Sequence, residues 1–488
     1  MESMNTRRPA TNSCRKSLED FSETFERDGA LWSNNEYSVV VHTLDLTIRP
    51  SQDQSQRVLN IKESTMNTEQ PELGAYIGLD WADVEHAVCL RVAATGEVRK
   101  YTVQQQPEKL HSWIISLLNE FGDSKVGVAV ESSRGGLVYA LMQYDFVIVY
   151  PINPKTLAKY RESTCVSGAK DDPSDAALLM DLIWRHRDRC RPWCPDTVET
   201  RAIQMLSEHR RKLVDDKTAL TNRLEALLKG YFPQALEWAG ALDTVQACDF
   251  LSKWPSLQSL QRSKPAQLRK FYLDHGCRRG EIIEKRMKDM RDAQLLTEDP
   301  AVIQASVLMV QATVDTMRPV CAAIKRFDDE LAAAFQQHPD HELYESFPGA
   351  GPVMEARLLA AMGSDRSRFE TAEEIQKFSG IAPVTRKSGK MHYVHRRYAC
   401  PRFLRQTFHE WARITIGFSD WARCYYEYQR SIGKRRHSAI RALAFKWIRI
   451  VFHCWKERVP YSEDLYLASI HRDKPTWAVR TGLVKKIA

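Results

Sequence analysis

The order of strand and helix patterns between residues 75 and 164 restricts the possible folds of this chain more than any other feature of its sequence. Apolar residues alternate in three consecutive short runs, AYIGLDWA, HAVCLRVA and EVRKYTVQ, which predicts three strands. Next, EKLHSWIISLLNEF has helical spacing, KVGVAVESS predicts a buried strand, and GGLVYALMQY, FVIVYPIN and PKTLAKYRES predict a helix, a strand and a helix. Three hairpin-connected strands followed by alternating helices and strands predict an α/β sheet with mixed strand directions.

Two carboxylates stand at the ends of these predicted strands. Asp80 closes the first strand and Glu131 closes the fourth, so both side chains would emerge at one edge of the sheet. A carboxylate that ends a buried strand is costly unless it is capped, paired or bound to a metal. Either residue alone is explained equally well by a helix cap or a loop salt bridge. Together they indicate a functional edge, and the order of elements is that of the RNase H-like fold.

Two further carboxylates, Asp172 and Asp175 in KDDPSDA, begin the next apolar helical run. Pro173 suits the first turn of a helix, and carboxylates three residues apart share one face there, where the helix dipole favours anions. By itself the motif is typical of an acidic helix start, and Asp171 is expected only to flank the site. Four carboxylates in one small volume would repel each other, which indicates Mg²⁺ or Mn²⁺ with oxygen ligands. Two such ions can clamp the attacking and leaving oxygens of a phosphoryl transfer.

Charge and cysteine usage restrict the partners and the compartment. The 488 residues carry a net charge of +8, and residues 379–488 contain 23 Lys and Arg against 7 Asp and Glu. This local excess predicts a nucleic-acid partner, bound with release of counterions from its phosphates. Eleven irregularly spaced cysteines are typical of thiols in a reducing compartment, and Cys190 and Cys194 lack a second pair to complete a zinc site. Apolar runs such as VGVAV are strand-length, so we expect a cytoplasmic, nucleoid-associated protein without a membrane span.

The first 65 residues differ from the rest, because they are polar and lack a sustained periodicity. Met66 then opens a short lead into the first strand, MNTEQPELGAYIGLDWAD. We therefore expect residues 1–72 to be an extension and Met66 to be the natural start. The alternative is an arm that contacts nucleic acid, and loss of activity on deletion of residues 1–65 would favour it.

A helical region, residues 199–340, is expected to follow the α/β domain of residues 73–198. Its first segment places apolar residues near a heptad seam with charges elsewhere. The seam residues are Ile203, Leu206, Leu213, Leu220, Leu224 and Leu227. A second helical stretch runs from about Gly280 to His338. A helical hairpin within one chain and a coiled coil between chains explain this pattern equally well.

A third domain, residues 341–460, is expected to begin with a Gly-x-Gly turn between two helical segments, in LYESFPGAGPVMEARLLAAMG. The pattern is typical of a helix-hairpin-helix, in which backbone N–H groups at Gly349 and Gly351 and the next helix N-terminus hold a phosphate. A Gly-Pro turn without a binding role is the alternative.

The end of this domain is predicted to be helical and is followed by a basic tail, residues 461–488. Arg435, Arg436 and Arg441 flank a predicted apolar helix face and remain available to phosphates. Interleaved aromatic residues can stack on unpaired bases, but helical spacing favours a place in the core. These aromatic residues include Tyr425, Tyr426 and Trp455.

The acidic motifs resemble those of the DEDD transposases of the insertion sequence 110 type, whose catalytic half is similar to the Holliday-junction resolvase RuvC. The motifs are GLDWADVEH, AVESSRGG and KDDPSDA, in the family's order and approximate spacing, and the resemblance extends from about Tyr76 to about Trp411. It implies a Mg²⁺ or Mn²⁺ site at the scissile phosphate, held by Asp80, Glu131, Asp172 and Asp175. It also implies a homodimer or homotetramer assembled through the helical region, and a noncoding guide RNA that bridges donor and target DNA.

A second block, FSGIAPVTRKSGKMHYVHRRYACPRFLRQTFHEWA, is similar to the same family, in which the serine at the position of Ser388 is the nucleophile. A lone serine in a basic loop more often binds phosphate or faces solvent, and a hydroxyl needs a base or a metal to attack. Gly389 permits close backbone approach, and the cations around Ser388 can stabilise a pentacovalent phosphate. These cations are Arg386, Lys387, Lys390, Arg396 and Arg397. Ser379 is the neighbouring alternative, in a segment more typical of a helix end. Family members often carry a Gly-rich stretch here, and this chain keeps only Ser-Gly-Lys.

The sequence therefore predicts an RNase H-like α/β domain, a long helical linker and a mostly helical C-terminal domain. The predicted function is a transposase that cuts and rejoins DNA through a covalent phosphoserine. One alternative is a RuvC-like, metal-dependent, structure-selective endonuclease that uses water. Another is a nucleic-acid-binding scaffold with a decayed acidic site.

Overall fold

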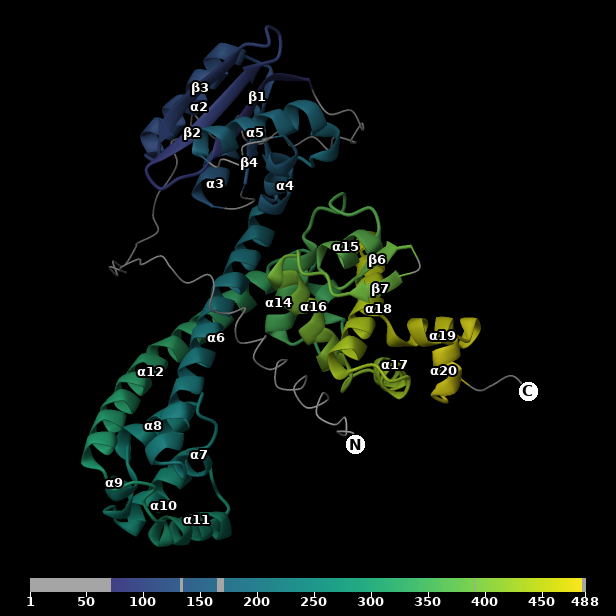
Figure 1. Ribbon diagram of the computed structural model, residues 1–488. Helices are drawn as coiled ribbons and strands as arrows, with labels where there is room; N and C mark the ends of the chain where they lie inside the picture. Colours follow the sequence, from purple (N-terminus) through teal and green to yellow (C-terminus); the bar gives the residue numbers. More distant parts are fainter. Residues whose placement is uncertain (1–71, 132–134, 165–170, 390, 485–488) are drawn as a thin grey trace, which may run out of the picture. The chain divides into compact units, whose positions relative to one another are not determined.

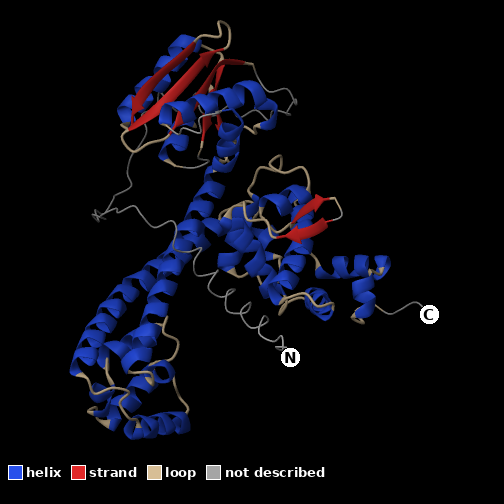
Figure 2. Cartoon of the chain, in the orientation of Figure 1, coloured by secondary structure: helices blue, strands red, loops and turns tan. Residues whose placement is uncertain are grey.

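The computed structural model of the chain describes residues 72–131, 135–164, 171–389 and 391–484. The predicted extension with its start at Met66, and the predicted phosphate ligand Lys390, lie outside the described residues. Residues 72–488 form one unit by their contacts. Strands occur in this unit only in one five-stranded sheet and one small hairpin, as far as the described residues show (Figure 2).

The five-stranded sheet has the order β3-β2-β1-β4-β5 (Figure 1). The strands are β1 (Leu73–Asp80), β2 (Glu85–Val92), β3 (Val98–Gln104), β4 (Lys125–Val130) and β5 (Val147–Pro151). Strand β2 is antiparallel to both β1 and β3, whereas β1, β4 and β5 run parallel. The mixed sheet predicted from the sequence is thus confirmed, with three consecutive antiparallel strands followed by parallel ones separated by helices.

Helices cover both faces of this sheet. They are α2 (Pro107–Phe121), α3 (Gly136–Leu141), α4 (Pro154–Thr164) and α5 (Asp172–His186), and α5 is followed by the short 3₁₀ helix η1 (Arg187–Arg189). On one face of β1, Ala75, Ile77 and Leu79 share a core with α2 and α3. On the other face α5 approaches so closely that a Cβ on Gly78 would lie 1.9 Å from the carbonyl oxygen of Ala176. Only glycine permits this approach.

Two long helices, α6 (Val198–Tyr231) and α12 (Pro300–Gln336), pair in an antiparallel arrangement. Thr200, near the start of α6, contacts His338 just beyond α12, with 3.0 Å between Oγ1 and Nε2. Five shorter helices form a lobe at the other end of the pair and share its core. They are α7 (Ala235–Trp238), α8 (Val245–Lys253), α9 (Leu257–Gln261), α10 (Pro265–Asp274) and α11 (Gly280–Asp292). The seam predicted for α6 therefore packs within the chain.

Among the described residues, α12 is the one helix long and apolar enough to cross a membrane by length and composition. Core helices of soluble proteins pass the same test. In this chain Val310, Val314 and Met317 of α12 are buried in the core of the lobe. The predicted helical stretch from Gly280 to His338 is interrupted, because α11 ends at Asp292 and α12 begins at Pro300.

The C-terminal part is mostly helical, as predicted, and its core is rich in tryptophan. Its elements are α13 (His341–Glu345), α14 (Pro352–Met362), α15 (Ala372–Phe378), β6 (Val384–Ser388), β7 (Met391–His395), α16 (Arg402–Thr415), α17 (Asp420–Ser431), α18 (Arg436–Glu457), α19 (Glu463–Asp473) and α20 (Thr476–Arg480). The ring of Trp447 lies 4.7 Å from that of Trp411 and 4.6 Å from that of Trp421 between centroids. Trp455 is fully buried, as helical spacing predicts.

Candidate active site and nucleic-acid interface

The first two acidic residues lie at one edge of the sheet. Asp80 is the last residue of β1, and Glu131 directly follows the last residue of β4. Because Leu79 and Val130 are in register on these parallel strands, Asp80 and Glu131 leave the sheet as neighbours. The carboxyl ends of neighbouring parallel strands are a common place for functional side chains.

The other two acidic residues lie in the first turn of α5, in different environments. Asp172 is exposed, whereas Asp175 is 2% exposed. Asp171 caps the helix, accepting a hydrogen bond of 2.8 Å from the backbone N–H of Ser174. Hydrogen bonding with the side chain and then the backbone of Ser174 lowers the pKa of Asp171. Asp171 thus caps the helix next to Asp172 and Asp175.

The carboxylate of Asp175 is paired with an arginine from α4. The guanidinium Nε of Arg161 donates to Oδ1 of Asp175 at 2.9 Å, and a second guanidinium nitrogen contacts the same oxygen. A buried carboxylate requires such compensation. Across the described chain, no three His, Cys, Asp or Glu side chains are gathered closely enough to hold a metal ion. The four carboxylates supply the oxygen donors that Mg²⁺ prefers, but Arg161 now balances the most buried one.

A buried histidine that the sequence reasoning did not single out fixes the loop after Asp80. His86 is fully buried at the start of β2, and its Nδ1 accepts the backbone N–H of Ala82 at 3.2 Å. Its Nε2 lies 2.5 Å from Oε1 of Gln105 and must donate there, so the ring is neutral with its proton on Nε2. Burial lowers the pKa of His86. The signal in the sequence was its position inside GLDWADVEH.

Ser388 lies on a hairpin rather than in the loop expected from the sequence. It is the exposed last residue of β6 and pairs with Met391 of β7, and Gly389 in the turn has a φ of 56°. The β-branched and aromatic residues in VTRKS and MHYVH suit a two-stranded ladder, which explains the difference. Ser379, the alternative serine, is fully buried at the end of α15, and its hydroxyl donates to the carbonyl of Gln376 at 3.4 Å.

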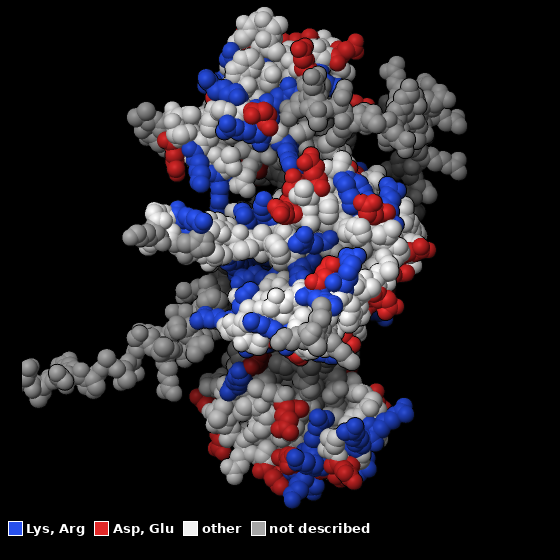
Figure 3. All heavy atoms as spheres, turned by 90° about the vertical axis from the view of Figure 1, so that its right-hand side faces the viewer, with Lys and Arg blue, Asp and Glu red and all other residues white. Residues whose placement is uncertain are grey.

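Cationic side chains surround this hairpin. Arg386 and Lys387 are exposed on β6, and the guanidinium of Arg396 lies 5.4 Å from the ring centre of Tyr398. Arg397 is partly buried, and its Nε has no hydrogen-bond partner in the described part of the chain. Figure 3 shows Lys and Arg, in blue, recurring over the middle of the viewed face, with Asp and Glu interspersed.

Arginine and histidine side chains from α16 and α18 lie near Arg396. Burial, and then the charges of Arg396 and Arg405, lower the pKa of Arg441. His409 stacks on His437 with 5.5 Å between ring centroids. Burial, then His437 and Arg441, lower the pKa of His409 to about 4. The sequence analysis did not select Arg405, His409 or His437, because only the packing of α16 against α18 brings them together.

The predicted helix-hairpin-helix glycines differ in their surroundings. Gly349 has a φ of 68°, and the side chains of Ile414 and Phe418 lie 2.8 Å from where a Cβ would be. Gly351 is the N-cap of α14 and has open space around it. Gly349 therefore packs against a helix end, whereas no atom lies within 4 Å of where a Cβ would be at Gly351.

Two transposase family models match this chain. One, a DEDD transposase model of the IS110 type, matches residues 77–233, and the other, described as the transposase IS116/IS110/IS902 family, matches residues 341–427. The first covers the carboxylates Asp80, Glu131, Asp172 and Asp175, and the second covers Ser388.

Proteins of several insertion elements are similar over most of their length. A mini-circle protein of Streptomyces coelicolor, assigned as the transposase for IS117, is 30% identical over 82% of this chain and 98% of its own length. A protein of insertion element IS116 from Streptomyces clavuligerus is 27% identical over 78% of this chain and 95% of its own length. An IS110 protein from Streptomyces coelicolor is 26% identical over 81% of this chain and 97% of its own length. With this coverage added to the matched motifs, the chain belongs to the IS110-type family of insertion-element transposases.

Proposed function

We propose that this chain cuts and rejoins DNA through the carboxylates Asp80, Glu131, Asp172 and Asp175 and the nucleophile Ser388. The observation that carries the proposal is the exit of Asp80 and Glu131 side by side from two parallel strands, with the acidic start of α5 packed on β1. The order β3-β2-β1-β4-β5, with β2 antiparallel to its neighbours, supports an RNase H-like domain.

In the proposed reaction the hydroxyl of Ser388 attacks a scissile phosphate. A bond forms between its Oγ and phosphorus, the bond to the 3′-oxygen of the leaving strand breaks, and that oxygen takes up the proton. The product is a 5′-phosphoserine, and attack by another 3′-hydroxyl reverses the step and rejoins DNA without hydrolysis. Arg386 and Lys387, exposed beside Ser388, can stabilise the pentacovalent phosphate. A bound Mg²⁺ or Mn²⁺ would lower the cost of charge on the attacking and leaving oxygens.

The carboxylates fit such an ion in chemistry, and all four come from the carboxyl edge of β1 and β4 or from the first turn of α5. In the described chain no three of them lie close enough together to hold the ion, so its binding would have to draw them closer. Arg161 pairs with Oδ1 of Asp175, so an ion would have to compete with this guanidinium for the carboxylate. A guanidinium on the buried Asp175 supplies the positive charge that an ion would otherwise bring.

We propose DNA as the substrate, with cytoplasmic action at the nucleoid, a guide RNA as a further partner, and a homodimer or homotetramer as the active assembly. The basic C-terminal part supports nucleic-acid binding. The guide RNA and the assembly rest on family membership, and the paired helices α6 and α12 are the region through which we propose that subunits join.

Covalent trapping tests the proposal. The full-length protein is incubated with Mg²⁺ and a nicked DNA carrying the element end, and the products are separated under denaturing conditions. We expect a protein–DNA adduct that is lost in Ser388→Ala. The matched control Thr385→Ala removes another exposed hydroxyl of β6 and should form the adduct.

Two other outcomes would contradict the proposal. Cleavage without an adduct, unchanged in Ser388→Ala, would indicate an endonuclease that uses water. Unchanged recombination in Asp80→Ala and Glu131→Ala would indicate a nucleic-acid-binding scaffold whose acidic residues have no catalytic role.

A further inference from the structure

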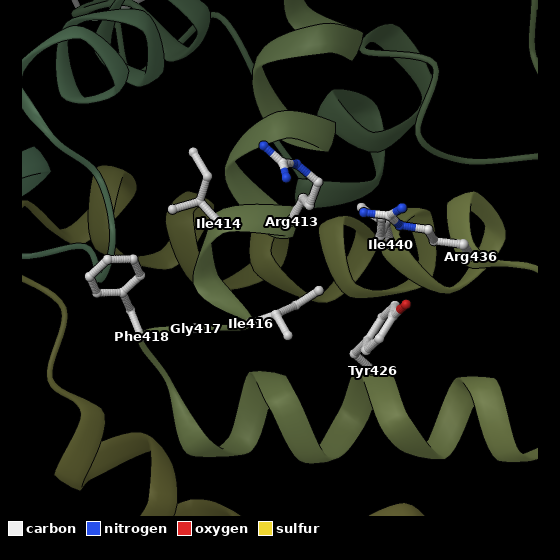
Figure 4. A pocket seen from close by; sticks show the side chains of 8 residues that line it. All are labelled: Arg413, Ile414, Ile416, Gly417, Phe418, Tyr426, Arg436 and Ile440. Carbon is white, nitrogen blue, oxygen red and sulfur yellow. The ribbon is translucent and has the colours of Figure 1, made fainter. Parts of the chain in front are cut away.

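A pocket of about 410 Å³ lies between the end of α16, the middle of α17 and the start of α18 (Figure 4). Its volume is in the range of small-ligand sites. The lining residues are Arg413, Ile414, Ile416, Gly417, Phe418, Tyr426, Arg436 and Ile440. Two cations, two aromatic rings and three isoleucines thus meet at one cavity whose lining includes no carboxylate.

The two cations of this pocket are available to an anion. Arg413 and Arg436 are both exposed, and neither guanidinium has a hydrogen-bond or ion-pair partner among the residues that the structure describes. In Figure 4 both guanidinium groups lie on the same side of the ring of Tyr426. Arg436 is also the first residue of α18, a helix of 22 residues without a side-chain cap at its start. The first-turn N–H groups and the helix dipole therefore add to the attraction for a phosphate.

The apolar part of the pocket suits a planar ring. Phe418 is 69% exposed, which is unusual for a large aromatic side chain, and Tyr426, in another part of the lining, is partly buried. Stacking of a nucleic-acid base on such rings removes apolar surface from water and tolerates any base, because every base has a π-face. Duplex DNA hides its bases, so an occupant of this pocket must be unpaired.

On the other side of Phe418 the charged side chains are acidic, opposite in sign to the two arginines. A second pocket of about 350 Å³ shares Gly417 and Phe418 with the first, and its lining includes Asp420 and Glu463. Glu463 accepts hydrogen bonds from Ser419 Oγ at 2.8 Å and from the hydroxyl of Tyr461 at 2.6 Å. Carboxylates on that side repel phosphates, so the backbone of a bound strand is directed to the arginine side.

We propose that the pocket binds one unpaired nucleotide of a single strand, with its base against Tyr426 and its phosphate between Arg413 and Arg436. The inference rests on the proposed function, which requires nucleic acid, and adds a site for a strand that is not base-paired. Neither Ser388 nor the carboxylates contribute to this pocket.

Binding of short oligonucleotides to the full-length protein tests the inference. Fluorescence anisotropy is measured with single-stranded DNA, single-stranded RNA and duplex DNA of equal length. We expect Tyr426→Leu to weaken single-strand binding about tenfold, while Tyr426→Phe, which keeps the ring, stays within about twofold of the native protein. Duplex affinity should be unchanged in both variants. The sugar preferred by the native protein tells whether the strand is DNA or RNA.

The arginines are tested by the salt dependence of the same binding. Arg436→Gln should reduce the slope of log affinity against log salt by about 0.7 for a single strand, because one phosphate contact is lost. The matched control Arg449→Gln removes an exposed arginine from the same helix, away from the pocket, and should leave the slope unchanged. Equal effects of the two substitutions would overturn the inference.

Photocrosslinking gives a direct readout. An oligonucleotide with 5-iodouracil should crosslink to Tyr426 or Phe418, as located by mass spectrometry of the peptides. Crosslinks only elsewhere, or equal loss of duplex and single-strand binding in Tyr426→Leu, would refute the pocket. Ser388→Ala should bind oligonucleotides normally. If the native protein forms no covalent adduct with DNA, the proposed function alone is contradicted. If Tyr426→Leu binds single strands as well as the native protein does, the pocket alone is contradicted.

Discussion

Arg161 in α4 forms an ion pair with Asp175 in α5, whose carboxylate is almost completely buried. The guanidinium Nε and the carboxylate Oδ1 are 2.9 Å apart. Because a buried charge needs a partner, this pair fixes the start of α5 to α4 and compensates the charge of Asp175.

Substitution of Arg161 should show how much the stability of the fold depends on its ion pair with Asp175. We expect Arg161→Met to lower the free energy of unfolding by about 3 kcal/mol, because it leaves Asp175 buried and unpaired. Urea denaturation measures the change. If Asp175 is a metal ligand, added Mg²⁺ will stabilise Arg161→Met more than the native protein, and an equal response would argue against Asp175 as a ligand. The double variant Arg161→Met with Asp175→Leu removes both charges and should recover most of the stability.

Gly78 tests the contact between α5 and β1. A Cβ at this position would lie 1.9 Å from the carbonyl oxygen of Ala176 and 2.4 Å from the backbone nitrogen of Met180, so α5 would have to move. We expect Gly78→Ala to lower the free energy of unfolding by about 3 kcal/mol or more, and to abolish the covalent adduct because Asp175 moves with α5. Gly136→Ala, which has open space around it, is the control and should change stability by less than about 0.5 kcal/mol. Equal effects would contradict the contact.

His409 should make stability fall in weak acid. The pKa of His409 is about 4 in the folded chain and about 6.5 in the unfolded chain. In the fold the His409 ring stacks on His437, with Arg441 and the carboxylate of Glu410 nearby. Between these values only the unfolded chain takes up the proton, so the free energy of unfolding decreases as pH falls from about 6.5 to about 4, by about 3 kcal/mol. His409→Gln should flatten this region of a pH series of urea denaturations. His453→Gln, which replaces an exposed histidine, should not.

Glu355 should have the opposite dependence on pH. Burial, and then the charge of Glu345, raise the pKa of Glu355 to about 7. The protonated form is favoured in the folded chain, so its contribution to stability is complete below about pH 4.5 and is lost as pH rises to about 7. We expect Glu355→Gln to raise the free energy of unfolding at pH 8 by about 1 kcal/mol and to leave it unchanged at pH 4.5. Glu342→Gln, at an exposed position, is the control, and an equal gain there would contradict the assignment.

Much of the sheet could be predicted from the sequence, because its strands and helices follow local periodicity. AYIGLDWA, HAVCLRVA and EVRKYTVQ form β1, β2 and β3 in succession, and KVGVAV forms β4. The positions of Asp80 and Glu131 at strand ends, and of Asp171 as a flanking cap, follow from the same local patterns. Ser388 was identified by family resemblance, and its place on a hairpin was missed because VTRKS is short, mostly polar and carries few strand-favouring residues.

The sequence by itself determined the strands and helices of the five-stranded sheet domain, the acidic strand ends and the family. Only the tertiary structure decided that Leu79 and Val130 are in register, that Arg161 pairs with Asp175, and that α6 packs on α12 of the same chain. It also decided that Arg413 and Arg436 line one pocket with Tyr426. The physical reason is that periodicity and capping act over a few residues, whereas each of these contacts joins different elements whose pairing depends on how the whole core is packed.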